Sequence, residues 1–255
     1  MIATLPMYDL PEIVPATDRY WALIRDALRD HGIAAPDALD RSGPVHAPWT
    51  DPGLILSQTC GMPFRTRLTG RVTLVATPDF GLTDVPQGHY VSRLIARADD
   101  PRGLAELVEG TMAYNNSDSQ SGWSAAVFHL AAAGLSPRDL AETGGHAAPL
   151  RAVAKGRADY AFCDALTFAL LECHRPTAVT RLRTVAVTEP TPGLPYITAL
   201  GRDPAPIRAA LADAVRALDA TDRGALMLNG IADIPESAYL AVPTPPFADQ
   251  FVREH

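Results

Sequence analysis

Residues 111–134 read TMAYNNSDSQSGWSAAVFHLAAAG, in which a short apolar run, a polar loop and a longer apolar run follow one another. Thr111–Tyr114 predicts a short strand, and Trp123–Ala133 predicts an apolar helix that stops at Gly134. Strands that alternate with helices in this way are typical of α/β proteins. The stretch therefore predicts the fold class and places a polar loop at the start of a helix.

The same alternation continues on both sides of this stretch. The residues predict strands at 2–7, 54–56, 72–76, 89–98, 158–163, 183–187 and 196–200, and helices at 149–155, 165–172 and 204–218. The last helix has amphipathic spacing, with Ile207, Leu211 and Val215 on one face. The pattern predicts an α/β protein with mostly parallel sheets flanked by helices.

Two stretches rich in proline and glycine, residues 77–88 and 188–195, interrupt the alternation. They predict a chain that leaves one lobe, builds a second and returns to the first. The expected lobe 1 is therefore discontinuous, with residues 1–88 plus 187–255, and the expected lobe 2 covers residues 89–186. A cleft between two lobes is a common place for a ligand.

The composition excludes several classes of protein. The chain has 255 residues, of which 47% are hydrophobic and 20% charged, as in an ordinary globular protein. Its net charge is −7, and its basic residues, of which only Lys155 is a lysine, are scattered among 29 acidic ones. Nucleic acids and anionic membranes require a basic stripe, so neither is an expected partner. No apolar run is long enough to predict a membrane-spanning helix.

The cysteines and the first residues bear on cofactors and on location. Cys60, Cys163 and Cys173 show neither metal-site spacing nor a disulfide framework, and the sequence predicts no metal and no cofactor. Residues 1–7 lack the basic region, apolar core and cleavage site of a signal peptide. The chain is then expected either to stay in the cytoplasm, which free cysteines favour, or to have lost a signal sequence.

The polar loop before the apolar helix is the first candidate site. Ser119, Gln120, Ser121 and Gly122 stand where that helix begins. The first N–H groups of a helix have no partner within it, and the helix dipole favours an anion there. Serine hydroxyls and backbone amides would form an oxyanion cradle, whereas plain N-capping is the commoner use of such serines. The sequence leaves both interpretations open.

A second polar run follows the predicted strand at 54–56. Ser57, Gln58 and Thr59 stand beyond its carboxyl end, where ligands bind in open α/β sheets. A turn that hydrogen-bonds its own backbone is the alternative. Cys60 has no adjacent base in the sequence and is expected to be a small buried thiol rather than a nucleophile.

Two further polar residues stand at the ends of predicted elements. His146 precedes the helix at 149–155 and would either donate to an anion or lie in a surface loop. Asp164 follows the strand at 158–163 and would bind a cationic group of a ligand or, as is commoner, cap the next helix. The chain contains no nucleophile elbow, phosphate loop, zinc-protease motif or dinucleotide fingerprint, so no enzyme is predicted.

Several short motifs follow one another along the chain in an order and spacing that resemble those of a known protein family. They lie at 5–8 (LPMY), 57–61 (SQTCG), 88–92 (GHYVS), 119–122 (SQSG), 145–146 (GH), 152–159 (AVAKGRAD) and Asp164. In this order and spacing the chain resembles, from Ala3 to about Tyr239, the periplasmic phosphate/phosphite/phosphonate-binding proteins of ABC importers. These proteins belong to the type II solute-binding superfamily.

The resemblance implies a two-lobed type II fold that closes on a small polar or oxyanionic ligand, such as a phosphonate. It also implies a periplasmic location and an ABC transporter permease as partner. The family's Ser-Thr-Ser-Gly helix start, which holds the phosphonate oxygens, is similar to residues 119–122, with Gln120 in place of threonine. The family's ligand-facing tyrosine resembles Tyr8, its histidine before a helix resembles His146, and Asp164 is nearest in position to its amine-binding acid.

Two alternatives remain on the same fold, because a fold does not determine a function. One is a cytoplasmic enzyme with lyase chemistry in cofactor biosynthesis, in which His146 and Asp164 would act as acid and base. The other is a ligand sensor. The predicted ligand-binding residues are therefore Tyr8, Gln58, Thr59, Ser119, Gln120, Ser121, His146 and Asp164, and no catalytic residue is predicted.

Overall fold

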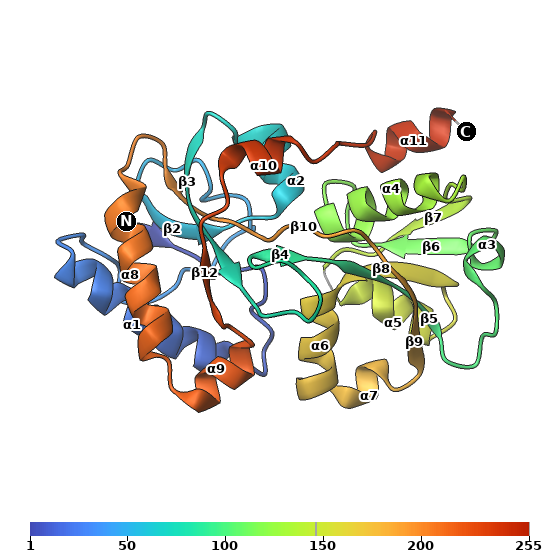
Figure 1. The fold of residues 1–255 in the computed structure, drawn as a ribbon, viewed down its shortest axis with the longest axis horizontal. Coiled ribbons are helices and arrows are strands. Elements are labelled where there is room, and N and C mark those ends of the chain that lie inside the picture. Colours follow the sequence, from blue (N-terminus) through green and yellow to red (C-terminus); the bar gives the residue numbers. More distant parts are fainter. Residues whose placement is uncertain (146, 255) are drawn as a thin grey trace. The chain divides into compact units, whose positions relative to one another are not determined.

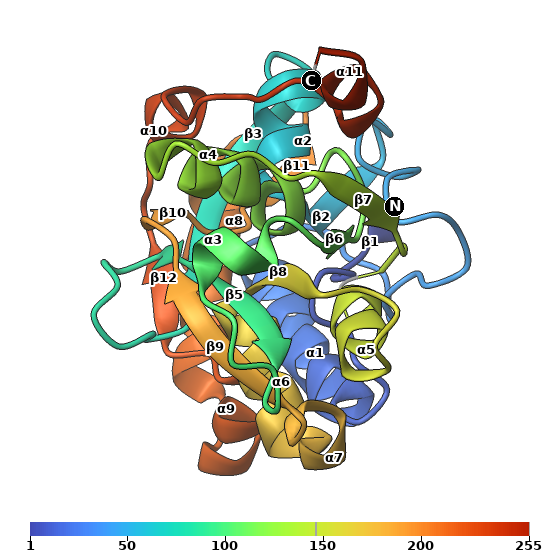
Figure 2. The ribbon, with the colours of Figure 1, turned by 90° about the vertical axis from the view of Figure 1, so that its right-hand side faces the viewer.

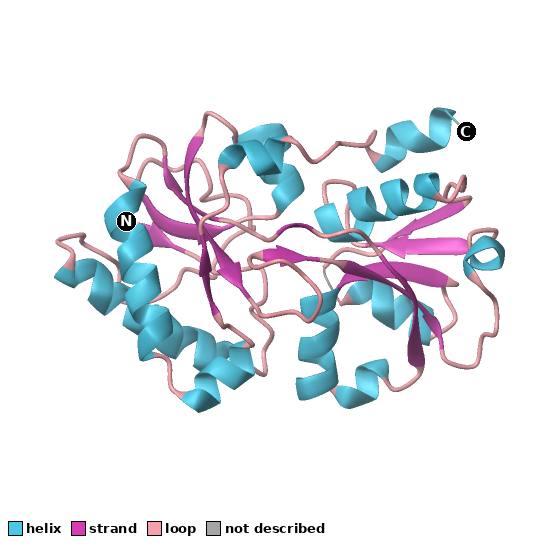
Figure 3. Ribbon diagram, viewed as in Figure 1, coloured by secondary structure: helices cyan, strands magenta, loops and turns pink. Residues whose placement is uncertain are grey.

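The computed structural model describes residues 1–145 and 147–254. Its contacts divide the chain into two compact units. Unit 1 contains Met1–His89 and Pro192–Val242, and unit 2 contains Tyr90–Thr191 and the segment from Pro243 onward. Each unit has a central sheet with helices around it (Figure 1, Figure 3). Among the described residues, no helix is both long and apolar enough to span a membrane.

Unit 1 is built on a five-stranded sheet. Its strands, in spatial order, are β1 (Ile2–Ala3), β2 (Leu54–Gln58), β11 (Tyr196–Ala199), β3 (Val72–Asp79) and β12 (Gly230–Ala232). Its helices are α1 (Val14–Asp30), α2 (Gly61–Pro63), the π-helical turn η1 (Phe64–Leu68), α8 (Pro204–Ala217), α9 (Ala220–Leu226) and α10 (Glu236–Leu240).

The core of unit 1 joins the sheet to its two long helices, α1 and α8, which pack against each other (Figure 1). α1 buries Tyr20, Ile24 and Leu28, which recur every three to four residues and so occupy one face. α8 buries Ile207 and Leu211 in the same cluster, as their spacing predicts. Burial of each such aliphatic side chain contributes about 1.5–3 kcal/mol, so this cluster holds both helices on the sheet.

Unit 2 has a second five-stranded sheet (Figure 2). Its strands, in spatial order, are β7 (Asp139–Glu142), β6 (Thr111–Tyr114), β8 (Tyr160–Asp164), β5 (Ser92–Arg97) and β9 (Leu182–Val187). Its helical elements are α3 (Leu104–Leu107), the π-helical turn η2 (Gln120–Ser124), α4 (Ala125–Ala132), α5 (Ala148–Ala154), α6 (Ala165–His174), α7 (Pro176–Val179) and α11 (Ala248–Glu254).

The predicted α/β class is confirmed, but the sheets are mixed rather than mostly parallel. In unit 1, β11 runs antiparallel to β2 and β3, and β12 runs antiparallel to β3. In unit 2, β5 runs antiparallel to β8 and β9. Only a helical crossover between neighbouring strands forces them to be parallel. β5 and β11 instead enter their sheets from connections between the units, which impose no such direction.

The first two passages between the units are the short strands β4 (His89–Tyr90) and β10 (Thr191–Pro192), which form a two-stranded sheet. Glycine is required beside both. Gly88 has a φ of +68°, and a Cβ added to it would lie 2.5 Å from the Cβ of Ala232. A Cβ on Gly193 would lie 2.8 Å from the carbonyl oxygen of Gly88. The glycines in these two stretches therefore permit a backbone path that other residues would block.

The C-terminal segment departs from the expected division of the chain. Residues 187–255 are all expected in lobe 1, but the structure places the segment from Pro243 onward in unit 2. The indole Nε1 of Trp123 donates to the carbonyl of Pro246 at 2.9 Å. The ring of Phe251 meets that of Trp123 edge to face at 5.4 Å. These contacts join residues more than 120 positions apart, so they could not be predicted from patterns of neighbouring residues in the sequence.

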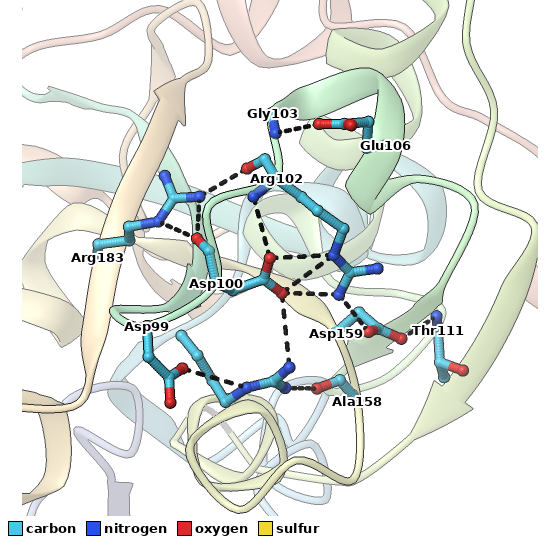
Figure 4. A network of polar contacts seen from close by, with 10 residues as sticks. Asp99, Asp100, Arg102, Gly103, Glu106, Thr111, Ala158, Asp159 and Arg183 are labelled. Atoms are coloured by element: carbon cyan, nitrogen blue, oxygen red, sulfur yellow. Dashed lines mark hydrogen bonds and ion pairs between the residues drawn. The ribbon is translucent and has the colours of Figure 1, made fainter.

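A network of charged groups links the residues at one end of the unit 2 strands (Figure 4). The Asp100 carboxylate, which is buried, accepts from the Nη2 of Arg102 at 2.7 Å, and the same nitrogen donates to Asp159 at 2.6 Å. Asp159 also accepts from the Thr111 backbone N–H at 2.9 Å. Arg183 donates to the carbonyl of Asp100 at 2.7 Å. The network connects the end of β5 with the starts of β6, β8 and β9, and so fixes how these strands align.

Arg102→Met should lower the free energy of unfolding of the chain by about 1–3 kcal/mol, because it leaves the buried Asp100 carboxylate without its main partner. Urea denaturation followed by circular dichroism measures the change. Arg138→Met is the matched control, since Arg138 pairs with Glu109 and both side chains are about two-thirds exposed. Equal losses in the two variants would contradict a stabilising role for the network.

Asp100 also predicts how stability changes in acid. Its hydrogen bonds with Arg102 hold the pKa of the carboxyl at about 2, below its ordinary value of 3.8. A lowered pKa contributes stability above pH 4, and this contribution is lost as the pH falls from about 4 to about 2. Unfolding free energies measured across this window should therefore fall more steeply for the native chain than for Asp100→Asn. Parallel curves would show that the carboxylate adds nothing to acid sensitivity.

Candidate ligand-binding site

The loops after β6, β7 and β8 leave the unit 2 sheet at the end of the strands opposite the charged network. β6 runs parallel to both β7 and β8, so the carboxyl ends of all three strands lie at this end. The backbone N–H and the hydroxyl of Thr143, after β7, each donate to the carbonyl of Tyr114 at 2.9 Å. The N–H of Gly144 donates to the carbonyl of Asn115 at 2.9 Å. The loop after β7 is therefore fastened to the polar loop after β6.

The polar loop leads into a helix whose first turn is unusually wide. η2 runs directly into α4, and the Ser124 N–H donates to the carbonyl of Ser119, five residues earlier, at 3.0 Å. The Ser119 hydroxyl accepts from the Gly122 N–H at 3.0 Å and so caps the helix. Capping by Ser119, one of the two interpretations of the sequence, is thus present. Because its oxygen is the acceptor in this bond, the hydroxyl proton of Ser119 can still be donated.

The side chains at this helix start are buried although they are polar. Ser119, Gln120 and Ser121 are 4%, 2% and 6% exposed. Within the described residues, the Ser121 side chain takes part in no hydrogen bond, in contrast to Ser119. A π-type turn inside a helix is often found at functional sites. The three neighbouring residues that the sequence singled out are brought together here.

Asn115, immediately after β6, belongs to the same cluster and was missing from the predicted site. Its side chain is 5% exposed, and its Oδ1 atom has no hydrogen-bond partner in the described part of the chain. A Cβ added to Gly122 would lie 2.2 Å from that oxygen, so the asparagine sits against the helix start. Buried oxygens without a partner are rare in proteins and mark places where another polar group belongs.

The remaining predicted residues of unit 2 are Asp164 and His146. Asp164 ends β8 and is 3% exposed, and its Oδ1 accepts from the Thr167 N–H at 2.7 Å. It therefore caps α6, which was the commoner use expected for such an aspartate. Its strand end is beside that of β6, so it lies at the same end of the sheet as the helix start. His146 lies outside the described residues.

In unit 1, the predicted residues lie at or after the carboxyl ends of two parallel strands, and β2 extends two residues further than expected, through Ser57 and Gln58. β1 pairs parallel with β2, and Gln58 is the last residue of β2. The Gln58 Nε2 donates to the carbonyl of Leu194 at 3.1 Å, and the Thr59 N–H donates to the carbonyl of Pro195 at 3.1 Å. Cys60, a buried thiol as expected, precedes the first residue of α2, so a helix starts here too. Tyr8 lies in the loop after β1.

Tyr8 and Gln58 are brought together at a small cavity of about 40 Å³. The cavity is lined, entirely within unit 1, by Leu5, Tyr8, Ile13, Thr17, Tyr20, Gln58, Phe80, Tyr196, Leu226 and Leu228. Thr59 is buried but is not among these lining residues. The rings of Tyr8 and Phe80 meet edge to face at 5.3 Å. This cavity is called the aromatic cavity below.

Two buried tyrosines keep the aromatic cavity electrically neutral. The hydroxyls of Tyr20 and Tyr196 lie 3.4 Å apart. Burial raises the pKa of Tyr196 to about 12 and raises that of Tyr20 well above its ordinary value. Both phenols therefore stay protonated at neutral pH. None of the ten lining residues carries a charged side chain.

A larger cavity of about 430 Å³ in unit 1 lies away from the predicted residues. Its lining includes Asp9, Asp40 and Arg41 from the loops after β1 and before β2. Arg41 pairs with Asp9 and with Asp18, and Asp40 accepts from the Ser42 N–H at 2.8 Å. Asp51, which also lines the cavity, accepts from the Gly53 N–H at 2.7 Å. The lining thus holds three carboxylates and one arginine, and this net negative charge does not suit an oxyanion.

Comparison with known proteins decides the family. Residues 56–235 match the family model described as ABC transporter, phosphonate, periplasmic substrate-binding protein. The chain belongs to this family. The resemblance inferred from the sequence is thereby confirmed, and the role of the chain is to bind a solute. Because the family consists of solute-binding proteins of ABC transporters, the lyase alternative is set aside.

Solved structures share the two-lobed fold. PhnD1 of Prochlorococcus marinus, in complex with methylphosphonate, matches with a TM-score of 0.72 at 12% identity, over 99% of this chain and 97% of its own. A Xanthomonas citri protein bound to ATP matches with a TM-score of 0.67 at 17% identity, over 100% and 98%. The binding protein component of a Pseudomonas aeruginosa ABC phosphonate transporter matches with a TM-score of 0.67 at 16% identity, over 94% and 82%. No curated protein sequence matches the chain.

The close approach of Asn115 and Gly122 predicts a compensating pair of substitutions in this phosphonate-binding family protein. Gly122→Ala should lower the free energy of unfolding by about 1–3 kcal/mol, because its Cβ would overlap the Asn115 side chain. Adding Asn115→Ala should restore most of that loss by removing the overlapping atoms. Chemical denaturation of the single and double variants measures both effects.

Gly224→Ala is the control for the effect of alanine itself. Gly224 lies in α9, and an added Cβ there would meet no atom within 4 Å. This variant should be as stable as the native chain or more so, because alanine favours a helix. If the double variant were no more stable than Gly122→Ala, the contact with Asn115 would not be what excludes a larger residue.

Proposed function

We propose that this protein binds a phosphonate through the helix start at residues 119–122 and passes it to the permease of an ABC importer in the periplasm. The observation that carries the proposal is the buried cluster of neutral donors at the wide first turn of η2. None of residues 119–122 carries a positive charge, so an oxyanion held there is bound by neutral donors and a helix end. The family of the chain and the methylphosphonate bound to PhnD1 support this choice of ligand.

In this proposed site, each residue of the cluster makes its own contact with the phosphonate. Ser121 donates its hydroxyl proton to one phosphonate oxygen, and the N–H groups of the first turn point to the same place. Ser119 accepts from Gly122 and donates to a second oxygen, so it both caps the helix and binds the ligand. Gln120 supplies a neutral amide where the family has threonine. Asp164, the last residue of β8, and His146 complete the proposed contacts of unit 2.

In unit 1 the proposal assigns ligand contacts to Tyr8, Gln58 and Thr59. Tyr8 and Gln58 are the two predicted residues that share the aromatic cavity. Thr59 lies two residues before Gly61, where α2 begins. The periplasmic location and the permease partner are proposed because family members serve ABC importers there.

Single serine substitutions test the proposed cradle. Ser121→Ala should raise the Kd for methylphosphonate by about 10- to 100-fold, because a hydrogen bond to a charged group contributes about 1.5–3 kcal/mol. It should leave the free energy of unfolding unchanged, since this hydroxyl makes no hydrogen bond within the described chain. Ser119→Ala should weaken binding similarly and also cost about 1 kcal/mol of stability through the lost cap.

Isothermal titration calorimetry with methylphosphonate gives the affinities, and urea denaturation gives the stabilities. Ser136→Ala is the matched control, since Ser136 lies exposed in the same unit. Unchanged affinity in Ser121→Ala and Ser119→Ala, with native affinity in the control, would reduce both serines to ordinary residues of a helix start and overturn the proposed function.

A further inference from the structure

Trp123 lies in the wide first turn of η2, and its side chain is fully buried. It follows Ser121 by two residues, and residues two apart on a helix do not face each other. The indole therefore lies on another side of the helix from the hydroxyl that is proposed to bind the ligand. Any influence of the indole on that hydroxyl passes through the backbone of the turn that both residues share.

Groups of unit 2 that are far apart in the sequence contact this indole. The centre of its ring lies 5.3 Å from that of Tyr114 and 5.4 Å from that of Phe251. Its Nε1 donates to the carbonyl of Pro246 at 2.9 Å. Pro246 and Phe251 both belong to the segment from Pro243 onward, so the C-terminal segment supplies two of these three contacts.

Tyr114 connects the indole to the polar loop. It is the last residue of β6 and stands directly before Asn115, whose side chain packs against Gly122. Its hydroxyl donates to Glu142, the last residue of β7, at 3.3 Å. Burial raises the pKa of Tyr114 to about 12, and the carboxylates of Glu142 and Asp249 add to the rise, so the phenol keeps its proton at neutral pH. Asp249 is on α11, so the C-terminal segment also comes close to Tyr114.

The C-terminal segment depends on its contacts with unit 2 to hold its shape. α11 is seven residues long, and isolated helices shorter than about 12 residues are marginal in water. Ala248 and Phe251 are buried and lie three positions apart, on one face of the helix. Prolines at 243, 245 and 246 fix φ along the approach to α11, which lowers the entropy lost when the segment docks. The segment is thus stiff where it approaches and relies on Phe251 where it docks.

We propose that the C-terminal segment positions the oxyanion site of unit 2. Phe251 and the carbonyl of Pro246 hold Trp123 in place, and Trp123 keeps the first turn of η2 wide. This inference rests on the proposed function. It makes Phe251 and Trp123 positioning residues, which act on the ligand through the turn and do not touch it.

The wide turn is what brings the proposed donors together. The Ser124 N–H donates to the carbonyl of Ser119, and the Gly122 N–H donates to the hydroxyl of Ser119. If the turn frays, both bonds break and both amide protons exchange with solvent. A chain that forms the wide turn for only part of the time also binds its ligand with an affinity reduced by that fraction.

Hydrogen exchange of the full-length, ligand-free chain tests the first step. In Phe251→Ala, the Gly122 and Ser124 amide protons should exchange about tenfold or more faster than in the native chain, as measured by NMR. Phe128→Ala is the matched control, because Phe128 is 36% exposed on α4, and there the rates should stay native. Native rates in Phe251→Ala would show that the segment does not hold the turn, and would overturn the inference.

The affinity for methylphosphonate tests the second step. Isothermal titration calorimetry should give a Kd about tenfold higher in Phe251→Ala, in proportion to the lost population of the wide turn. Arg102→Met is the control for general destabilisation, since it weakens the opposite end of the strands, and its Kd should stay native. A native Kd in Phe251→Ala, or an equal rise in both variants, would reduce Phe251 to a structural residue and contradict the inference.

A milder variant guards against loss of the fold. Phe251→Leu keeps most of the buried apolar volume, so both its exchange rates and its Kd should lie between those of the native chain and those of Phe251→Ala. Thermal unfolding of each variant establishes that it is folded at the temperature of the measurements. Native values in a folded Phe251→Leu variant, where Phe251→Ala does not fold, would count against the inference.

The outcomes separate this inference from the function on which it rests. If the native chain binds no methylphosphonate, the proposed function fails, and the positioning of an oxyanion site fails with it. If the native chain binds and Ser121→Ala weakens binding but Phe251→Ala does not, the proposed function stands and only the role of the C-terminal segment is wrong.

Discussion

The hydrogen bond from the Gly122 N–H to the Ser119 hydroxyl determines where the helix after β6 begins, and much of unit 2 depends on that point. It holds the wide first turn in which Ser119, Gln120 and Ser121 are buried together. Asn115 packs so closely against this turn that only glycine fits at position 122. The loop after β7 is in turn fastened to Tyr114 and Asn115. A shift of the helix start by one residue would turn its polar groups away and separate these loops.

The two ends of the unit 2 strands differ in how completely their buried polar groups are paired. At one end, Arg102, Asp100 and Asp159 satisfy one another and align the ends of four strands (Figure 4). At the other, the buried polar groups are only partly satisfied, as Asn115 Oδ1 shows within the described residues. Unsatisfied polar groups are costly for a fold. A rigid, fully paired end of the same sheet allows such groups to persist where a ligand is proposed to satisfy them.

The cavity beside Tyr8 and Gln58 has no charged lining residue, although the chain as a whole is acidic. The protein is acidic, and the cavity that holds Tyr8 and Gln58 is neutral because buried phenols keep their protons. Charged residues of the same unit form ion pairs, such as Arg19 with Asp222 and Arg41 with Asp9. In the proposed function, helix ends and hydroxyls attract the oxyanion at short range, whereas a lysine cluster would attract many anions from a distance.

The sequence by itself determined the α/β class, the family and the position of the polar loop at a helix start, because each depends on residues that are close together in the sequence. Strand and helix periodicity, the apolar run from Trp123 and the order of short motifs are local features. The tertiary structure alone decided what depends on distant partners. It made the sheets mixed, since β5 and β11 enter from the connections between units, and it joined the C-terminal segment to unit 2 through Trp123 and Phe251. It also added Asn115 to the helix start and gathered Tyr8, Gln58 and Tyr196 around one cavity, because only folding brings together side chains that lie nearly two hundred residues apart.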